Sequence, residues 1–359
     1  MAIRTRVLIA LLVLPPAFEL AVRFDDWLRY GVAFSSRASS IEDLQEVDSL
    51  GRHGRPNAVY RKFRINALGF RGPEVRPTDI SVRPLIVVSG SSETFGLYES
   101  DGKEWPRQLS DSLAKVCANQ PVTVLNAGFA GMSMPTVVQD LKLRILPMKP
   151  RVIVYHPQPA QYLDRTSPEA SAITAHASAP PSAWHLRAGP QVRDEIKRAI
   201  PDALLDWLRR LDTERSRREQ YPLFASLPIE RLDTLEAQLR LMVGTVRRSG
   251  AVIVVVLPKN RFDDTTSIDE QRWLRAWERF VPRATAALFL DFSARANERI
   301  QRVARDSTVP LIDPVFPRGR ARSLMFADPV HYSDLGASIM AAASTGILAK
   351  ILSFTDGSG

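Results

Sequence analysis

The sequence predicts a three-layer α/β/α domain, in which a five-stranded parallel sheet lies between two layers of helices. Short apolar runs recur along the chain, amphipathic helical patterns separate them, and the first two runs are followed by glycine-containing turns. A parallel strand that is buried on both faces is apolar throughout. The alternation of such strands with helices is typical of an α/β fold.

The composition is that of a folded globular protein. The chain has 359 residues, of which 45% are hydrophobic and 24% are charged, enough for one large α/β domain or two small ones. A net charge of +9 suits an anionic membrane surface, an acidic polysaccharide or nucleic acid. We do not expect a nucleic-acid partner, because the arginines are scattered and no nucleic-acid-binding motif is present. Cys117 is the only cysteine, so an intramolecular disulfide is impossible.

The N-terminus carries an export pattern. Arg4 and Arg6 precede an apolar run over residues 7–14, which continues to residue 22 with Glu19 inside it. Residues 15–19 contain a poor small-x-small cleavage site, so we expect residues 1–24 to remain as a membrane anchor with the arginines on the cytoplasmic side. The run is shorter than the roughly 20 residues of a usual span. Secretion after cleavage is the alternative.

The remaining elements follow in order along the chain. Residues 25–80 are expected to form an irregular arm, and residues 81–359 the main domain with a helical insertion at 164–245. The insertion begins with a Ser-, Ala- and Pro-rich loop at 165–183, followed by helical stretches at about 190–216 and 229–248. The expected strands are 85–88, 122–125, 152–155, 252–256 and 309–312, and the other expected helices are 103–118, 135–147, 268–280, 291–306 and 333–352.

Candidate chemical groups follow these strands. Ligands of open α/β sheets bind beyond the carboxyl ends of the strands. Ser92 comes after the first strand, Gly128 after the second, and Asp328 and His331 after the fifth. A carboxylate three residues before a histidine on a turn can accept a hydrogen bond from imidazole Nδ1. The Nε2 atom is then free to take a proton from a serine hydroxyl.

These features together resemble the SGNH/GDSL hydrolase family, and more closely its membrane-anchored bacterial members from surface-polysaccharide systems. The resemblance implies the flavodoxin-like fold of that family, with no cofactor and no metal. It also implies that Ser92 is the nucleophile, His331 the general base and Asp328 its orienting partner. The backbone N–H groups of Ser92 and Gly128 would be oxyanion donors. The resemblance rests on residues 66–74, the block around Ser92, Trp105-Pro106, residues 126–128, and residues 328–331 with Gly336.

Two positions depart from the family pattern. Ser91 stands where the family usually has an aspartate, a change from which we expect little damage. Pro159 stands where members commonly carry the asparagine that is the third oxyanion donor. Losing one such donor typically lowers kcat about 10²–10³-fold. Gln158 or Gln161 could restore this donor from a neighbouring position.

Three further residues have expected roles. His156 ends the third strand at the ligand edge, where it could contact substrate or have a structural role. Glu93 is expected to stabilise the start of its helix as a first-turn acid. Trp277 is expected to be a packing residue. His53, His176 and His185 lie in predicted loops or the insertion and show no metal-ligand spacing.

The expected function is ester hydrolysis outside the cytoplasm. The resemblance implies a small acyl group, such as acetyl on carbohydrate, that is removed or transferred to another sugar hydroxyl. The expected partners are an acylated carbohydrate or other small ester, and the inner membrane through the anchor, with the catalytic domain in the periplasm. The alternative is a catalytically impaired glycan-binding or assembly component of a surface-polysaccharide system. The sequence leaves the oligomeric state open.

Overall fold

The computed structural model contains one five-stranded parallel sheet, with strand order β6-β5-β7-β8-β9. The structure describes residues 2–163, 186–189, 192, 200–219, 222–263, 270, 273–274, 277–278 and 280–354. Every neighbouring pair in this sheet is parallel. The strands are β5 (Leu85–Gly90), β6 (Thr123–Asn126), β7 (Val152–His156), β8 (Val252–Val256) and β9 (Leu311–Ile312). The predicted α/β class and strand number are therefore confirmed.

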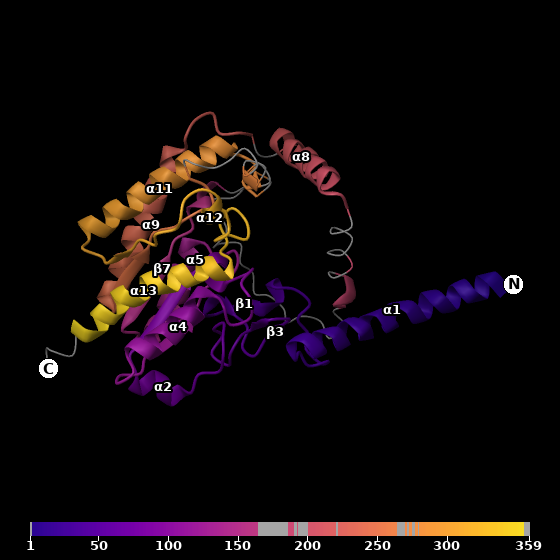
Figure 1. Cartoon of the computed structure of the whole chain (residues 1–359), viewed down its shortest axis with the longest axis horizontal. Coiled ribbons are helices and arrows are strands. Elements are labelled where there is room, and N and C mark those ends of the chain that lie inside the picture. Colours follow the sequence, from indigo (N-terminus) through magenta and orange to yellow (C-terminus); the bar gives the residue numbers. More distant parts are fainter. Residues whose placement is uncertain are drawn as a thin grey trace.

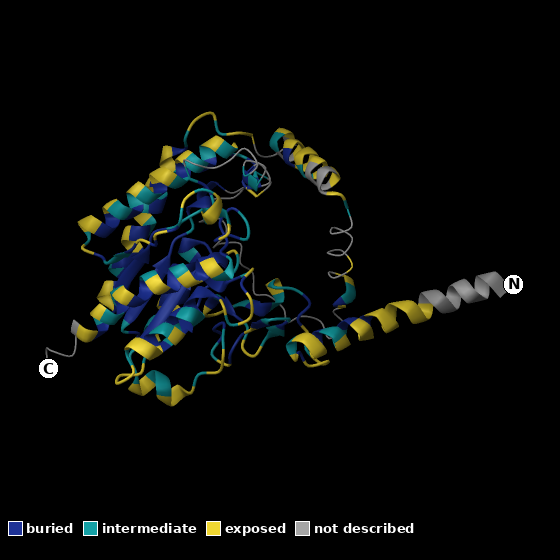
Figure 2. Cartoon of the chain, in the orientation of Figure 1, coloured by how far each residue is buried: buried dark blue, intermediate teal, exposed yellow. Residues whose placement is uncertain are grey.

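Helices cover both faces of the sheet (Figure 1). Because successive strand residues point to opposite faces, Ile86 and Val88 pack in one apolar cluster and Leu85 and Val87 in another. Figure 2 shows the buried residues concentrated between the helical layers. The first cluster includes α4 (Trp105–Val116) and α13 (Asp334–Phe354), and the second includes α5 (Met134–Asp140), α9 (Ile229–Arg248) and α11 (Ala286–Asp306).

Several helical elements of the domain are short or irregular. A π-helical turn, η2 (Leu141–Ile145), and a 3₁₀ turn, η3 (Leu146–Met148), continue α5, so the helix expected at 135–147 is not regular throughout. The other short elements are α2 (Pro77–Val82), α3 (Ser92–Phe95), α12 (Arg320–Ser323), η1 (Glu42–Leu44) and η4 (Pro159–Leu163).

The segment expected as an irregular arm is more regular than predicted. Helix α1 (Ala2–Tyr30) extends beyond residue 24, and two antiparallel hairpins follow it. Strands this short give no readable alternation in the sequence. The hairpins are formed by β1 (Gln45–Asp48) with β2 (Gly51–Gly54) and by β3 (Val59–Tyr60) with β4 (Phe63–Arg64).

The end of the arm docks on the sheet. The Asn66 side chain accepts hydrogen bonds from the N–H groups of Leu68 and Phe70, both at 3.0 Å, and so closes a turn. Phe70 is fully buried, and the Arg71 N–H donates to Asn126 O at the end of β6. The arm therefore covers the outer edge of the sheet beside the carboxyl end of β6.

Part of the predicted insertion belongs to the main helical layer. Leu235 and Leu239 of α9 are buried in the same cluster as α11 and the sheet. Helix α8 (Asp202–Glu219) lies apart from this layer (Figure 1). The loop predicted at 165–183 lies outside the described residues, as do parts of the helices predicted at 190–216 and 268–280.

One helix of the described part is long and apolar enough to cross a membrane. This segment is Asp334–Ser353 of α13, with a mean hydropathy of 1.6, and 44% of it is buried inside the domain. Met340 and Leu348 on its inner face are fully buried in the cluster with α4. The segment therefore packs as a core helix.

We expect two glycines of α13 to respond oppositely to alanine. A Cβ atom at Gly336 would lie 2.0 Å from Met325 O, whereas a Cβ at Gly346 meets nothing within 4 Å. Gly336→Ala should lower the free energy of unfolding by about 1–3 kcal/mol through overpacking. Gly346→Ala should raise it by up to about 1 kcal/mol through helix propensity. Chemical denaturation of both variants checks this, and equal effects would contradict the packing described here.

Candidate active site

Ser92 lies at the tight turn between β5 and α3. It is the first residue of α3, and its side chain is buried. A Cβ atom at Gly90 would lie 2.3 Å from Thr94 Oγ1 and 3.0 Å from His156 O, so only glycine fits before the turn. This close packing fixes the direction in which the Ser92 hydroxyl leaves the sheet.

The structure brings Ser92, His331 and Asp328 together, as the sequence predicted. Ser92 Oγ lies 2.8 Å from His331 Nε2, although 239 positions separate the two residues. His331 Nδ1 lies 2.7 Å from Asp328 Oδ2. The other carboxylate oxygen, Oδ1, accepts the backbone N–H groups of Val330 at 3.0 Å and His331 at 2.8 Å. The carboxylate thus holds both the loop and the ring.

The acidic groups around His331 favour the protonated form of its imidazole. Burial lowers the pKa of His331, but the hydrogen bond and charge of Asp328, with the charges of Glu93 and Glu99, outweigh it and raise the pKa. Burial raises the pKa of Asp328, but the hydrogen bond and charge of His331 outweigh it and lower the pKa. Asp328 therefore stays ionised while His331 takes up a proton.

The structure places the Gly128 N–H away from the site, contrary to the sequence prediction. This N–H donates to Asn126 Oδ1 at 3.0 Å. A Cβ atom at Gly128 would lie 2.6 Å from Thr94 Cβ and 2.8 Å from Phe95 N, so the glycine allows α3 to pack on this loop. An N–H that is already bonded inside the loop cannot serve as the second oxyanion donor.

Gly131, which the sequence analysis missed, lies at the site instead. It lines the same cavity as Ser92 and His331, and its φ of +78° is in the region that favours glycine. Among the described residues, no acceptor takes the N–H of Gly131 or of Ser92. The second glycine of the Gly128-to-Gly131 turn was the available sequence signal.

Two glutamines near Pro159 in the sequence, Gln158 and Gln161, lie at the cavity. Gln161 Nε2 lies 2.7 Å from Gln158 Oε1. Gln161 Nε2 also lies 3.0 Å from Ser91 Oγ and 2.7 Å from Met132 O, so acceptors surround it. Gln158 is the better placed of the two candidate donors. One N–H of its amide group donates to an acceptor, and the other N–H has no acceptor among the described residues.

That one acceptor is Glu93. Gln158 Nε2 donates to Glu93 Oε1 at 2.6 Å, and Ser92 Oγ lies 3.3 Å from Glu93 Oε2. Glu93 is buried, and this burial raises its pKa. Glu93, predicted from the sequence as a first-turn acid, therefore contacts both Ser92 and the Gln158 amide.

A cavity of about 350 Å³ opens in front of Ser92. Its polar lining includes the two glutamines. Its apolar lining includes Tyr98 and Trp277, whose ring centres lie 5.3 and 6.3 Å from the His331 ring. Trp277, expected as a packing residue, thus lines the site, and the sequence analysis did not single out Tyr98. The other apolar lining residues are Leu97, Ala130, Ala160, Phe280 and Val281.

His156 does not line this cavity. It is buried, its ring lies 6.2 Å from the Trp105 ring, and its Nε2 lies 3.3 Å from the Tyr332 hydroxyl. Burial lowers the pKa of His156 to about 3, so the ring is neutral. The structural reading of His156 is therefore favoured over substrate contact.

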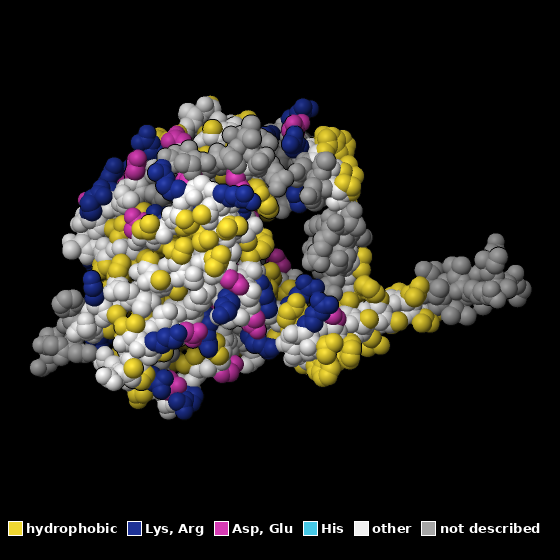
Figure 3. Space-filling view, viewed as in Figure 1, with side chains coloured by type: hydrophobic (Ala, Val, Ile, Leu, Met, Phe, Trp, Pro, Cys, Tyr) yellow, Lys and Arg dark blue, Asp and Glu magenta, His cyan; other side chains and the backbone are white. Residues whose placement is uncertain are grey.

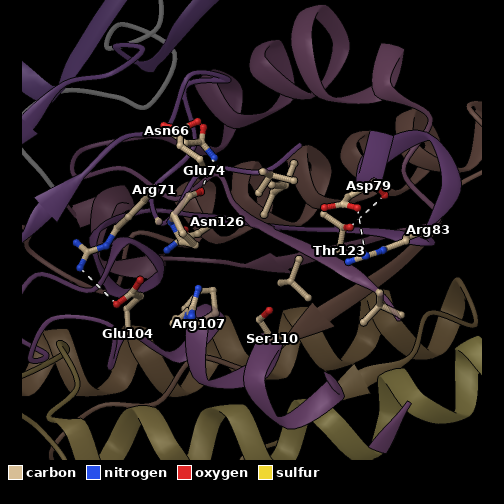
Figure 4. Close-up of a pocket in the computed structure, with 17 residues that line it drawn as sticks. Asn66, Arg71, Glu74, Asp79, Arg83, Glu104, Arg107, Ser110, Thr123 and Asn126 are labelled. Carbon is tan, nitrogen blue, oxygen red and sulfur yellow. Dashed lines mark hydrogen bonds and ion pairs between the residues drawn. The ribbon is translucent and has the colours of Figure 1, made fainter. Parts of the chain in front are cut away.

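Two other groupings lie away from this cavity. A hollow of about 170 Å³ lies between the arm, α4 and β6 (Figure 4), where Arg71 pairs with Glu104 at 3.5 Å. The β1–β2 hairpin gathers Glu46, Asp48 and His53, a grouping that the sequence spacing did not reveal. The His53 ring contacts Gly54 O and Asp48 Oδ1 at 2.9 and 3.1 Å, so these contacts hold the hairpin together.

No family model and no curated protein matches the sequence. Among solved structures, a lipase/acylhydrolase from Enterococcus faecalis is similar over 74% of this chain and 96% of its own, with 14% identity and a TM-score of 0.42. A GDSL-like lipase from Bacteroides thetaiotaomicron matches over 78% and 92%, with 11% identity and a TM-score of 0.41. A Geobacillus acetyl-xylooligosaccharide esterase matches over 75% and 94%, with 14% identity and a TM-score of 0.41.

We expect Asp328→Asn to lower the pKa of His331. The wild-type value should lie above the ordinary 6.5, since Asp328 raises it, and the variant loses the charge that does so. Imidazole NMR signals followed through a pH titration measure this, with His331→Gln used for assignment. His156 is an internal control that should stay neutral in both proteins. An unchanged His331 titration would contradict the described pairing.

Proposed function

We propose that this chain is a serine esterase that cleaves acyl esters through Ser92, His331 and Asp328. The observation that carries the proposal is the unbroken hydrogen-bonded chain from the Ser92 hydroxyl to the buried carboxylate, with contacts of 2.8 and 2.7 Å. The Ser92 end of this series of hydrogen bonds faces a cavity of about 350 Å³, large enough for a small ester. Nucleophile, base and orienting acid at such distances are the arrangement used in acyl transfer.

The reaction follows from these positions. Ser92 Oγ attacks the acyl carbonyl carbon while His331 Nε2 takes the hydroxyl proton. The ester C–O bond then breaks, and His331 gives the proton to the leaving alcohol oxygen. Water attacks the acyl-enzyme in the same way and restores Ser92. Because His331 must be neutral to accept a proton, its raised pKa moves the acidic limb of activity to higher pH.

We assign the oxyanion hole to the N–H groups of Ser92 and Gly131, with the free N–H of Gln158 as the third donor. Glu93 accepts the other N–H of Gln158 and so fixes the amide plane. Donors held in advance at the developing charge contribute most to such reactions. The Gln158 amide would then perform the task for which the resembling family uses an asparagine.

The proposed substrate is an ester of a small acyl group, such as acetyl on carbohydrate. The resemblance of the Ser92, Asp328 and His331 blocks to surface-polysaccharide members of the SGNH/GDSL family supports this substrate. The same acyl-enzyme would serve either hydrolysis or transfer to a sugar hydroxyl. We place the reaction in the periplasm, with the chain attached to the inner membrane by residues 1–24 of α1.

A second candidate function is glycan binding or assembly without turnover. The engagement of the Gln161 amide with three acceptors favours it, because Gln161 then contributes nothing to the oxyanion hole. The two functions make opposite predictions for the reactivity of Ser92.

A fluorophosphonate probe should label the chain at Ser92. Ser92→Ala should abolish labelling and cleavage of p-nitrophenyl acetate, because the nucleophile is lost. Ser91→Ala is the matched control and should still be labelled. Intact-mass and peptide analysis locate the adduct. A folded wild-type protein that takes no label and cleaves no ester would favour the binding function.

Gln158→Ala should lower kcat about 10²–10³-fold with little change in KM, because a donor to the oxyanion acts mainly in the transition state. Gln120→Ala, at an exposed glutamine before β6, is the matched control and should leave both constants unchanged. Steady-state kinetics with p-nitrophenyl acetate measure this. A variant with the wild-type kcat would remove Gln158 from the oxyanion hole.

A further inference from the structure

Helix α8 turns its polar side toward the protein. Among the α8 side chains that the structure describes, Thr213 is the buried one. Arg217 donates to Glu278 Oε2 and Pro282 O, both at 2.7 Å, and to Ala284 O at 3.2 Å. A surface helix of a soluble protein normally packs through its apolar face instead. The orientation of α8 is therefore inverted.

The apolar face of α8 points away from the protein. Its members are spaced at i, i+3, i+4 and i+7, which places them on one side of the helix. Figure 3 shows hydrophobic side chains along the outer edge of this helix. Nothing in the described part of the chain covers them. These residues, with their exposed fractions, are Leu204 (46%), Trp207 (55%), Leu208 (43%) and Leu211 (45%).

Residues 187 and 188, upstream of α8 in the sequence, are attached to α1. The backbone N–H groups of Arg187 and Ala188 donate to the Glu19 carboxylate at 3.2 and 2.9 Å. The Arg187 guanidinium also pairs with Asp26 at 3.3 Å, and both side chains are buried. These contacts give Glu19 and Asp26 of α1 hydrogen-bond partners and hold residues 187 and 188 beside that helix.

Helices α1 and α8 lie on one side of the molecule. In Figure 1, α8 lies on the side of the domain from which α1 projects. The part of α1 whose side chains are described also exposes a large apolar surface. Its members are Leu12, Val13, Leu14, Phe18, Leu20, Phe24, Trp27 and Leu28.

Positive charges flank the apolar face of α8. Arg215 and Arg218 follow Leu211 by four and seven residues, so both belong to the same side of the helix, and both are exposed. Leucines with a tryptophan on one face and arginines beside them are typical of helices that lie in a membrane interface. Arginines at this level interact with anionic lipid headgroups.

We propose that the apolar face of α8 lies in the surface of an anionic phospholipid bilayer, as a second attachment beside α1. The inference goes beyond the esterase function and rests on the proposed anchoring of α1. Its consequence is a fixed orientation of the domain, because one spanning helix allows rotation about its axis and a second contact prevents it.

The test places an environment-sensitive label on α8 in the full-length chain. Cys117→Ser removes the native thiol, and Leu208→Cys then carries the fluorophore NBD. The protein is reconstituted into phosphatidylcholine vesicles with and without phosphatidylglycerol, some containing doxyl-labelled lipid. Leu241→Cys, at an exposed leucine of α9, is the matched control. Leu14→Cys reports separately on the anchor, and thermal unfolding verifies that each variant is folded.

We expect the label at position 208 to shift to shorter wavelength and to be quenched by doxyl lipid, more strongly with phosphatidylglycerol present. The fluorescence of the label at position 241 should be quenched by iodide in the aqueous phase and not by doxyl lipid. Nanodiscs holding one copy should give the same result, which excludes a second copy of the chain as the cover. If the label at 208 emits as it does in water while the label at 14 is quenched by doxyl lipid, the attachment of α8 is overturned and the anchor through α1 stands. Water-like labels at both positions would overturn the anchor as well.

Discussion

The hydrogen bonds of the Asp328 carboxylate determine the geometry of the whole site. One oxygen takes two backbone N–H groups of its own turn, and the other takes the imidazole of His331. A buried carboxylate with all its partners in place is costly to disturb. The ring is therefore held with Nε2 toward Ser92, and the loop before α13 is held against the carboxyl edge of the sheet.

The sequence was sufficient to predict the fold and to predict that Ser92, His331 and Asp328 lie together. Buried parallel strands give continuous apolar runs, and a flavodoxin-like strand order leaves the ends of β5 and β9 with their following loops at one edge. The choice between Gly128 and Gly131 could not be made in this way. It depends on which N–H the Asn126 side chain captures, and such competition for an acceptor is decided only in three dimensions. The same is true of the glutamine amides and of the inverted side of α8.

The environment of Glu93 connects several of these details. A carboxyl group buried next to the nucleophile disfavours its own ionisation, which is why its pKa is raised. It nevertheless contacts both Ser92 and the Gln158 amide. In the proposed oxyanion hole, the longer Gln158 side chain would therefore need Glu93 to restrain its amide.

The apolar character of α13 has a consequence for the synthesis of the protein. In the native domain, the sheet and α4 cover its inner face. In the proposed export, this segment would pass through the translocation channel before the sheet has formed, and a stretch with a mean hydropathy of 1.6 resembles a stop-transfer sequence. Its glycines, serines and threonine lower the gain from entering lipid. These small residues would therefore influence whether this last helix reaches the compartment in which the domain folds.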